Sequence, residues 1–252
     1  MKINFKYKRK SYEVDLSKPI DLSIPLIPES KGPRCFYAPK FSAKPFKSGS
    51  FIGSVKEGAP VNFFNLKLNP HGNGTHTESV GHITKEQESI NATLKKYHCM
   101  AQLMSVCPME NKAGDRVITK KNLESEWGRS TPEALIIRTY PNEEEKKNKD
   151  YSGTNPAYFS SSALREIVKR GVKHLLVDLP SVDREEDEGK LQGHKIFWDI
   201  KTQKRRDCTI TEMIFVPNNV KDGLYFMNLQ IPSFEMDAAP SKPVIYRPKL
   251  IK

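Results

Sequence analysis

A strand–helix–strand pattern in the middle of the chain limits the folds that are open to it. Residues 134–138 (Ala-Leu-Ile-Ile-Arg) form a compact apolar run that predicts a buried strand. Residues 164–168 then carry apolar side chains at helical spacing, and Gly171 stands where a glycine commonly ends a helix. A second apolar run, residues 174–179, predicts another buried strand. Two buried strands joined by a helix form a right-handed βαβ unit, so we expect parallel pairing and an α/β protein.

Many short β elements are expected on both sides of this unit. Partial alternation in residues 1–15 predicts a β-hairpin, and Thr119 is placed to cap a helix over residues 120–126. The remaining apolar runs predict strands over residues 50–55, 61–68, 103–106, 117–118, 214–216, 225–229 and 244–246. No internal repeat or linker divides the chain, and 252 residues suffice for a core. We therefore expect one mixed α/β domain over residues 1–252.

The charge and the cysteines exclude several classes of protein. The chain has 41 Lys and Arg against 30 Asp and Glu, a net charge of +11 that suits an anionic small-molecule substrate. Because the basic residues are spread along the chain, they favour a solvated basic surface over a basic stripe that binds nucleic acid. No apolar run is long enough to span a membrane, and no secretory signal is recognised. The four cysteines are scattered without a C-x-x-C pair, which predicts reduced thiols in a cytoplasmic protein.

Histidine is concentrated in one glycine-rich segment. Three of the six histidines, His71, His76 and His82, fall within twelve residues, and Glu78 lies between the last two. Imidazole and carboxylate groups suit Zn²⁺, Mn²⁺ or Fe²⁺. On an extended strand His76 and Glu78 point to the same face, and His82 shares that face if the strand continues. A surface loop that happens to carry histidine is the alternative, but the in-phase carboxylate favours a metal site.

The same segment resembles the signature H-x-G-T-H-x-D-x-P-x-H of the metal-dependent cyclase family, which includes bacterial kynurenine formamidase and isatin hydrolase. Residues 74–76 match G-T-H, Glu78 stands at the Asp position and His82 at the final His. Two differences are visible. His71 precedes the G-T-H histidine by five residues where the family has four, and Val80 replaces the proline.

Further segments follow the order of the same family. Residues 21–23 resemble its D-L-S segment, and residues 178–183 with His194 resemble D-x-x-S-x-D…H. Residues 211–212 and 240–244 resemble two later family segments. The resemblance implies a swivelling β/β/α, cyclase-like fold with a mixed sheet, in a homodimer or homotetramer.

The resemblance also implies roles for individual residues. It implies ligands for one or two Zn²⁺ or Mn²⁺ ions per chain: His71, His76, Glu78, His194 and Glu212. The extra residue before His76 leaves open whether His71 is a ligand. His82 takes the place of the general acid and base. An aromatic residue after the D-L-S segment contacts substrate in relatives, and Phe36 and Tyr37 are equal candidates.

The function implied is hydrolysis of an amide, formamide, cyclic amide or ester, as in arylformamidases, with a water activated by the metal. Glu78 in place of Asp and the shifted His71 keep an alternative open, a weakened relative that binds metal or a small ligand without turnover. Asp178 and Asp183 follow the strand predicted at 174–179, where they suit either a ligand site or a turn.

Overall fold

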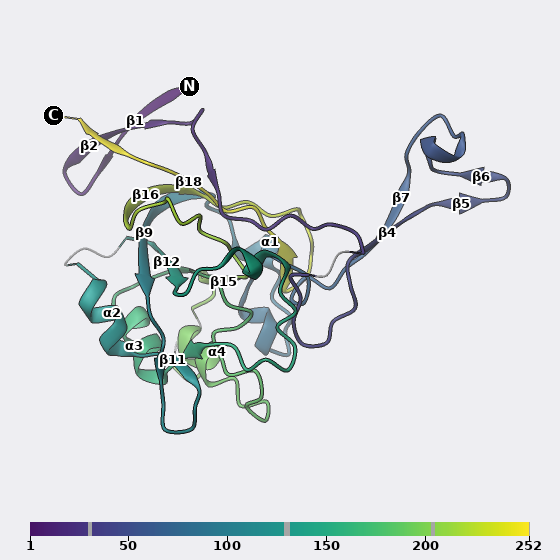
Figure 1. Ribbon diagram of the computed structural model, residues 1–252. Helices are drawn as coiled ribbons and strands as arrows, with labels where there is room; N and C mark the ends of the chain where they lie inside the picture. Colours follow the sequence, from purple (N-terminus) through teal and green to yellow (C-terminus); the bar gives the residue numbers. More distant parts are fainter. Residues whose placement is uncertain (30–31, 129–131, 203–204, 252) are drawn as a thin grey trace.

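A nine-stranded mixed sheet that curls into a half-barrel organises the protein (Figure 1). The computed structural model describes residues 1–29, 32–128, 132–202 and 205–251. In spatial order the strands of this sheet are β17 (Ala238–Pro240), β8 (His76–Glu78), β15 (Thr209–Glu212), β14 (His174–Val177), β12 (Ala134–Thr139), β9 (His98–Val106), β16 (Gly223–Asn228), β18 (Val244–Tyr246) and β3 (Ile20–Asp21). The four central strands, from β15 to β9, are parallel, and the strands on both sides pair antiparallel. The sheet is therefore mixed, as the family resemblance implies.

Helices cover one face of the sheet and form the larger core. They are α2 (Lys120–Glu126), α3 (Ser161–Lys169) and α4 (Gln192–Phe197). Because side chains alternate along a strand, Leu135 and Ile137 of β12 lie in the core with these helices. Ala134 and Ile136 lie on the other face, in a second apolar cluster that also takes in the short helix α1 (Ile90–Thr93). With both faces covered, β12 is buried along its whole length.

The central strand–helix–strand prediction is confirmed. β12 and β14 pair parallel with Ala134 opposite His174, and α3 connects them. Gly171 follows α3 with φ +77°, a left-handed conformation that favours glycine. The helix predicted over residues 120–126 is α2, where Thr119 and Asn122 form a reciprocal capping box.

Two strand predictions are wrong. Residues 50–55 contribute only β6 (Phe51–Ile52) before the chain enters the 3₁₀ turn η1 (Val55–Glu57). Residues 214–216 are apolar and buried but form no strand, because β15 ends at Glu212 and Met213 takes φ +51°. The apolar run at 214–216 is buried without strand pairing, because pairing depends on a neighbouring strand.

Residues 42–67, here called the arm, project from the body of the molecule (Figure 1). β4 (Ser42–Pro45) pairs with β7 (Phe64–Lys67), and beyond them β5 (Lys47–Ser48) pairs with β6. Several large apolar side chains of the arm are exposed, among them Val55, Val61, Phe63, Phe64 and Leu66. The arm is therefore held by local pairing rather than by burial.

The two ends of the chain meet in a small sheet. β1 (Lys2–Tyr7) and β2 (Lys10–Asp15) form the hairpin predicted for residues 1–15, and β19 (Lys249–Ile251) joins it. A third small sheet contains β10 (Met109–Glu110), β11 (Arg116–Ile118) and β13 (Tyr158–Phe159). The chain also forms 3₁₀ turns at Val80–Ile83 (η2) and Glu144–Asn148 (η3). Among the described residues, no helix combines the length and apolar character needed to cross a membrane.

Candidate metal centre

Three adjacent strands bring histidine and carboxylate side chains together at one edge of the large sheet. β8 lies between β15 and β17, and its His76 stands directly opposite Glu212 of β15. Glu78 stands opposite Ala238, the first residue of β17, so Asp237 arrives beside the same strand. Strand pairing thus assembles residues that lie more than 130 positions apart in the sequence.

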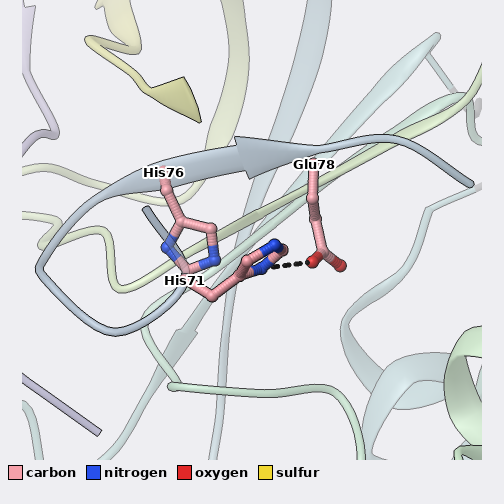
Figure 2. Close-up of side chains that lie close together, drawn as sticks. All are labelled: His71, His76 and Glu78. Carbon is pink, nitrogen blue, oxygen red and sulfur yellow. Dashed lines mark ion pairs between the residues drawn. The ribbon is translucent and has the colours of Figure 1, made fainter. Parts of the chain in front are cut away.

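His71 and His76 approach one another from the two ends of the glycine-rich loop (Figure 2). His71 Nδ1 lies 3.1 Å from Glu78 Oε2, and its Nε2 lies 2.7 Å from Asp237 Oδ2. His76 Nε2 lies 3.4 Å from Glu212 Oε2, while its Nδ1 lies 3.0 Å from the Gly74 carbonyl. The extra residue between His71 and His76, relative to the family signature, therefore does not prevent His71 from lying beside the Glu78 carboxylate.

His194 reaches the cluster from α4, on the helical side of the sheet. Its Nε2 lies 3.2 Å from Glu78 Oε1, and its Nδ1 lies 2.6 Å from Asp183 Oδ2. The Asp183 carboxylate also accepts hydrogen bonds from the backbone N–H groups of Gly193 and His194, at 2.5 and 3.1 Å. A Cβ at Gly193 would lie 2.7 Å from Asp183 Oδ1, so this close approach requires glycine. Asp183 is thus a positioning residue that directs Nε2 of His194 toward Glu78.

The strand that carries His76 and Glu78 does not continue to His82, so strand periodicity does not apply to His82. β8 ends at Glu78, and Ser79 caps the 3₁₀ turn η2 by accepting a hydrogen bond from Gly81 N–H. The turn still delivers His82 to the cluster, with Nε2 3.8 Å from Glu78 Oε2 and Nδ1 3.4 Å from Asp237 Oδ2. A change of backbone conformation, not strand periodicity, places this side chain.

Several buried polar atoms of the cluster have no hydrogen-bond partner among the described residues. They are His76 Nε2, both carboxylate oxygens of Glu78 and His194 Nε2. His76 and Glu78 are fully buried, and His194 is 2% exposed. Buried polar groups are normally paired, because losing water without replacement costs about 1–3 kcal/mol per group. Unpaired imidazole and carboxylate atoms that converge are the donor set of a divalent cation, so the residues present fit a metal ion.

The distances between candidate ligand atoms are consistent with this fit. Three overlapping groups of the described residues place one ligand atom each within 4.8 Å of the others. The groups are His71, His76 and Glu78; His71, His82 and Asp237; and Glu78, His82 and His194. Glu78 belongs to two of them, as expected for a carboxylate that can serve two neighbouring positions.

The histidines around Glu78 balance the negative charge of its buried carboxylate. Burial raises the pKa of Glu78, but His82, His194 and His71 outweigh it and hold the pKa well below its ordinary value. Burial likewise lowers the pKa of His71, but Asp237 and Glu78 raise it to about 10. The pKa of His194 is also raised, because Asp183 and Glu78 overcome the effect of burial. Protonated imidazoles therefore supply positive charge where a metal ion would supply it.

A cavity of about 650 Å³ opens onto the cluster. Its lining includes His71, His82, His194 and Glu212, together with Phe36. Tyr37, the other aromatic candidate, is 75% exposed and is not among the described residues that line this cavity. Of the two aromatic candidates, Phe36 is therefore the one placed to meet a ligand.

Sequence reasoning did not single out Asp237, which contacts both His71 and His82. The only available signal was its position, three residues before Pro240 in the segment that resembles the end of the family sequence. By sequence Asp183 suits either a ligand site or a turn, and in the structure it positions His194. Asp178 instead accepts hydrogen bonds from Thr139 and Lys146 and does not line this cavity.

The fold and the cluster define a class of α/β protein in which histidine and carboxylate side chains gather at one edge of a half-barrel sheet. The sequence profile of the family described as "Putative cyclase" matches residues 14–184, and the chain belongs to that family. No curated protein matches this chain.

Solved structures share the fold. A potential metal-dependent hydrolase with cyclase activity is 16% identical with a TM-score of 0.63, and the match covers 91% of this chain and 98% of that one. A predicted metal-dependent hydrolase from Bacillus stearothermophilus is 15% identical, with a TM-score of 0.60 and the same coverage. Isatin hydrolase A from Labrenzia aggregata is 12% identical with a TM-score of 0.64, covering 91% and 93%. These matches support a cyclase-like fold over nearly the whole chain.

Proposed function

We propose that this protein is a metal-dependent hydrolase that cleaves an amide, formamide, cyclic amide or ester. The observation that carries the proposal is the cluster of buried His76, Glu78 and His194 atoms that have no hydrogen-bond partner among the described residues, beside a cavity that His194 lines. The family and the relatives described as metal-dependent hydrolases support the same conclusion. The metal is Zn²⁺ or Mn²⁺, at one or two ions per chain.

The proposed ligands divide between two neighbouring positions. His71, His76 and Glu78 would hold one ion. The family resemblance assigns Glu78, His194 and Glu212 to a second ion. Glu78 Oε1 lies 3.2 Å from His194 Nε2, and Glu212 Oε2 lies 3.4 Å from His76 Nε2. When bound, the ion polarises a carbonyl group and lowers the pKa of a water molecule toward about 7.

His82 is proposed as the residue that moves the proton. It is partly exposed and lines the cavity, with Nε2 3.8 Å from Glu78 Oε2. Its Nδ1 faces Asp237, so the proton it collects can be held at Nε2 and passed to the leaving nitrogen or oxygen. Asp237 orients the ring, and Phe36 contributes an apolar wall.

The test combines metal analysis with an activity panel on protein purified without chelators or a histidine tag. We expect one or two Zn or Mn ions per chain, and metal-dependent hydrolysis of at least one N-formyl aromatic amine, small lactam or aryl ester. His76→Ala should remove both, while His98→Ala, at an exposed histidine outside the cluster, should change neither. No bound metal after addition of Zn²⁺ and Mn²⁺ would contradict the proposal. Bound metal without turnover would instead identify a relative that binds without catalysis.

The oligomeric state belongs to the same proposal. The family resemblance predicts a homodimer or homotetramer, and the exposed apolar side chains of the arm offer a surface for such contacts. Light scattering across a range of protein concentrations tests this. A monomer at every concentration would contradict it.

A further inference from the structure

One segment of the wall of the cavity above the metal centre carries a charge opposite to that of the whole chain. Residues 183–188 contain five carboxylates and one arginine, in a protein whose net charge is +11. All six residues line the cavity. Residues 185–188, here called the acidic rim, place four consecutive carboxylates at it. His71, His82 and His194 line another part of the cavity, so a ligand meets negative charge at the acidic rim, which the composition of the chain does not predict.

The arginine within this segment does not neutralise the rim. Arg184 Nε lies 3.2 Å from Asp115 Oδ2, and its guanidinium also donates to the Glu186 carbonyl. Its charge is thus directed at a carboxylate outside the cavity lining. The rim keeps its negative charge toward the cavity.

Three of the four rim carboxylates have partners, and one has none. Glu185 accepts hydrogen bonds from the backbone of Gly153 and Asn155, and Asp187 accepts them from residues 190–191. Glu188 lies 2.7 Å from Lys190 Nζ. The Glu186 carboxylate is exposed and has no side-chain partner among the described residues. It is the rim carboxylate available to a ligand.

Two further features show that the cavity is built for a ligand and not merely acidic. His194, 2% exposed, lines the same cavity with an Nε2 atom that has no hydrogen-bond partner among the described residues. Phe36 presents an aromatic ring at the wall, 44% exposed. Carboxylates beside an aromatic ring are the combination that recognises ammonium groups.

A second large cavity has paired charges. It measures about 600 Å³ and is lined by Lys173, Asp207, Arg206 and Glu88, among others. There Lys173 lies 2.5 Å from Asp207, and Arg206 lies 3.0 Å from Glu88. Those four charges satisfy one another, and Lys95 and Lys96 also line this cavity, which does not favour a cation. The cavity above the metal centre is therefore the better candidate for a cationic ligand.

Resting on the proposed function, we infer that the substrate is a cation: an ester or amide with an ammonium group at the end remote from the scissile bond. The scissile carbonyl lies at the histidine cluster, and the ammonium group lies against Glu186 and Phe36. This reverses the expectation of an anionic substrate, which rested on the charge of the whole chain. Glu186 is thus a specificity-determining residue.

The test uses three hydroxamic acids with the same chain, ending in trimethylammonium, tert-butyl or carboxylate, titrated calorimetrically into the Zn²⁺-loaded protein. The cation should bind about tenfold more tightly than its tert-butyl isostere, and the carboxylate should bind most weakly. High salt should reduce this preference. Equal affinities of the three compounds would overturn the inference while leaving the metal centre intact.

A variant pair locates the preference. Glu186→Gln should reduce the preference for the cation to about threefold and leave the affinity for the tert-butyl compound unchanged. Glu110→Gln, at an exposed carboxylate outside the cavity, should change none of the affinities. A cation preference that survives Glu186→Gln in full would contradict the role of this residue.

The inference is separable from the proposed function. If the protein holds no metal, the metal-free chain is titrated with choline and with its carbon isostere, 3,3-dimethylbutan-1-ol. Preferential binding of choline that Glu186→Gln abolishes would support the cationic site even though the hydrolase proposal had failed. Equal binding of the two compounds would overturn the inference.

Discussion

The metal centre and the arm are both built from short strands, but they are held in opposite ways. At the metal centre, β8 has a paired neighbour on each side, and His76 and Glu78 are fully buried. In the arm, β4 and β7 pair only with one another, and Phe63 and Leu66 are more than half exposed. Burial on both sides holds the imidazole and carboxylate side chains close together in positions that suit an ion, whereas local pairing in the arm orders the backbone and leaves several side chains in solvent.

The largest effect is expected from removing a ligand at the metal centre. His76→Ala takes away an imidazole whose Nε2 converges with Glu212 and has no other hydrogen-bond partner among the described residues. We expect metal affinity to fall by more than about 100-fold, because loss of even an outer partner typically costs 10–100-fold. Competition titration against a fluorescent chelator measures this. Unchanged affinity would mean that the metal binds elsewhere.

The next effect concerns the sheet that supports the centre. Ile137→Ala removes a fully buried side chain between β12 and the helices, and should lower the free energy of unfolding by about 2–5 kcal/mol. Urea denaturation followed by circular dichroism gives the value. A loss below about 1 kcal/mol would indicate that the core around β12 is looser than its burial implies.

The third prediction concerns the pH dependence of metal binding at the cluster. The pKa of His71 is raised to about 10 and that of His194 is also raised, so metal must displace their protons at neutral pH. Apparent metal affinity should rise about tenfold per pH unit for each proton released between pH 7 and 9. Calorimetry in two buffers of different ionisation enthalpy counts the protons. Affinity independent of pH would contradict the assignment of these histidines.

The same shift has a consequence for the metal-free protein. Because the pKa of His71 is raised on folding, its ion pairs stabilise the folded state fully below the ordinary imidazole pKa of about 6.5. That contribution is lost as the pH rises through about 10. Added metal should therefore stabilise the protein more at pH 9 than at pH 7.

The smallest effect is expected in the arm. Leu66→Ser changes a side chain that is 61% exposed, and should alter the free energy of unfolding of the single chain by less than about 0.5 kcal/mol. Denaturation at two protein concentrations gives the value and shows whether a second copy covers this side chain. A larger loss that grows with concentration would assign Leu66 to an interface between copies.

The central βαβ unit and most residues of the candidate metal centre could be predicted from the amino-acid sequence alone. Apolar runs at 134–138 and 174–179 are long and regular enough to predict buried parallel strands, and three histidines in twelve residues predict a metal site. Both signals are local, because hydrophobic periodicity and residue composition can be recognised within a short stretch of sequence. For the same reason the hairpin at 1–15 and the capped helix at 120–126 were predictable.

Features that depend on contacts between distant parts of the chain could be seen only in the folded structure. Asp237 joins the cluster because β17 pairs with β8, and His82 joins it through a turn that interrupts the expected strand. The apolar run at 214–216 is buried without pairing. The acidic rim faces the cavity although the whole chain is basic, because local charge depends on which loop covers the site. Strand neighbours and loop positions are long-range properties, and no window of sequence contains them.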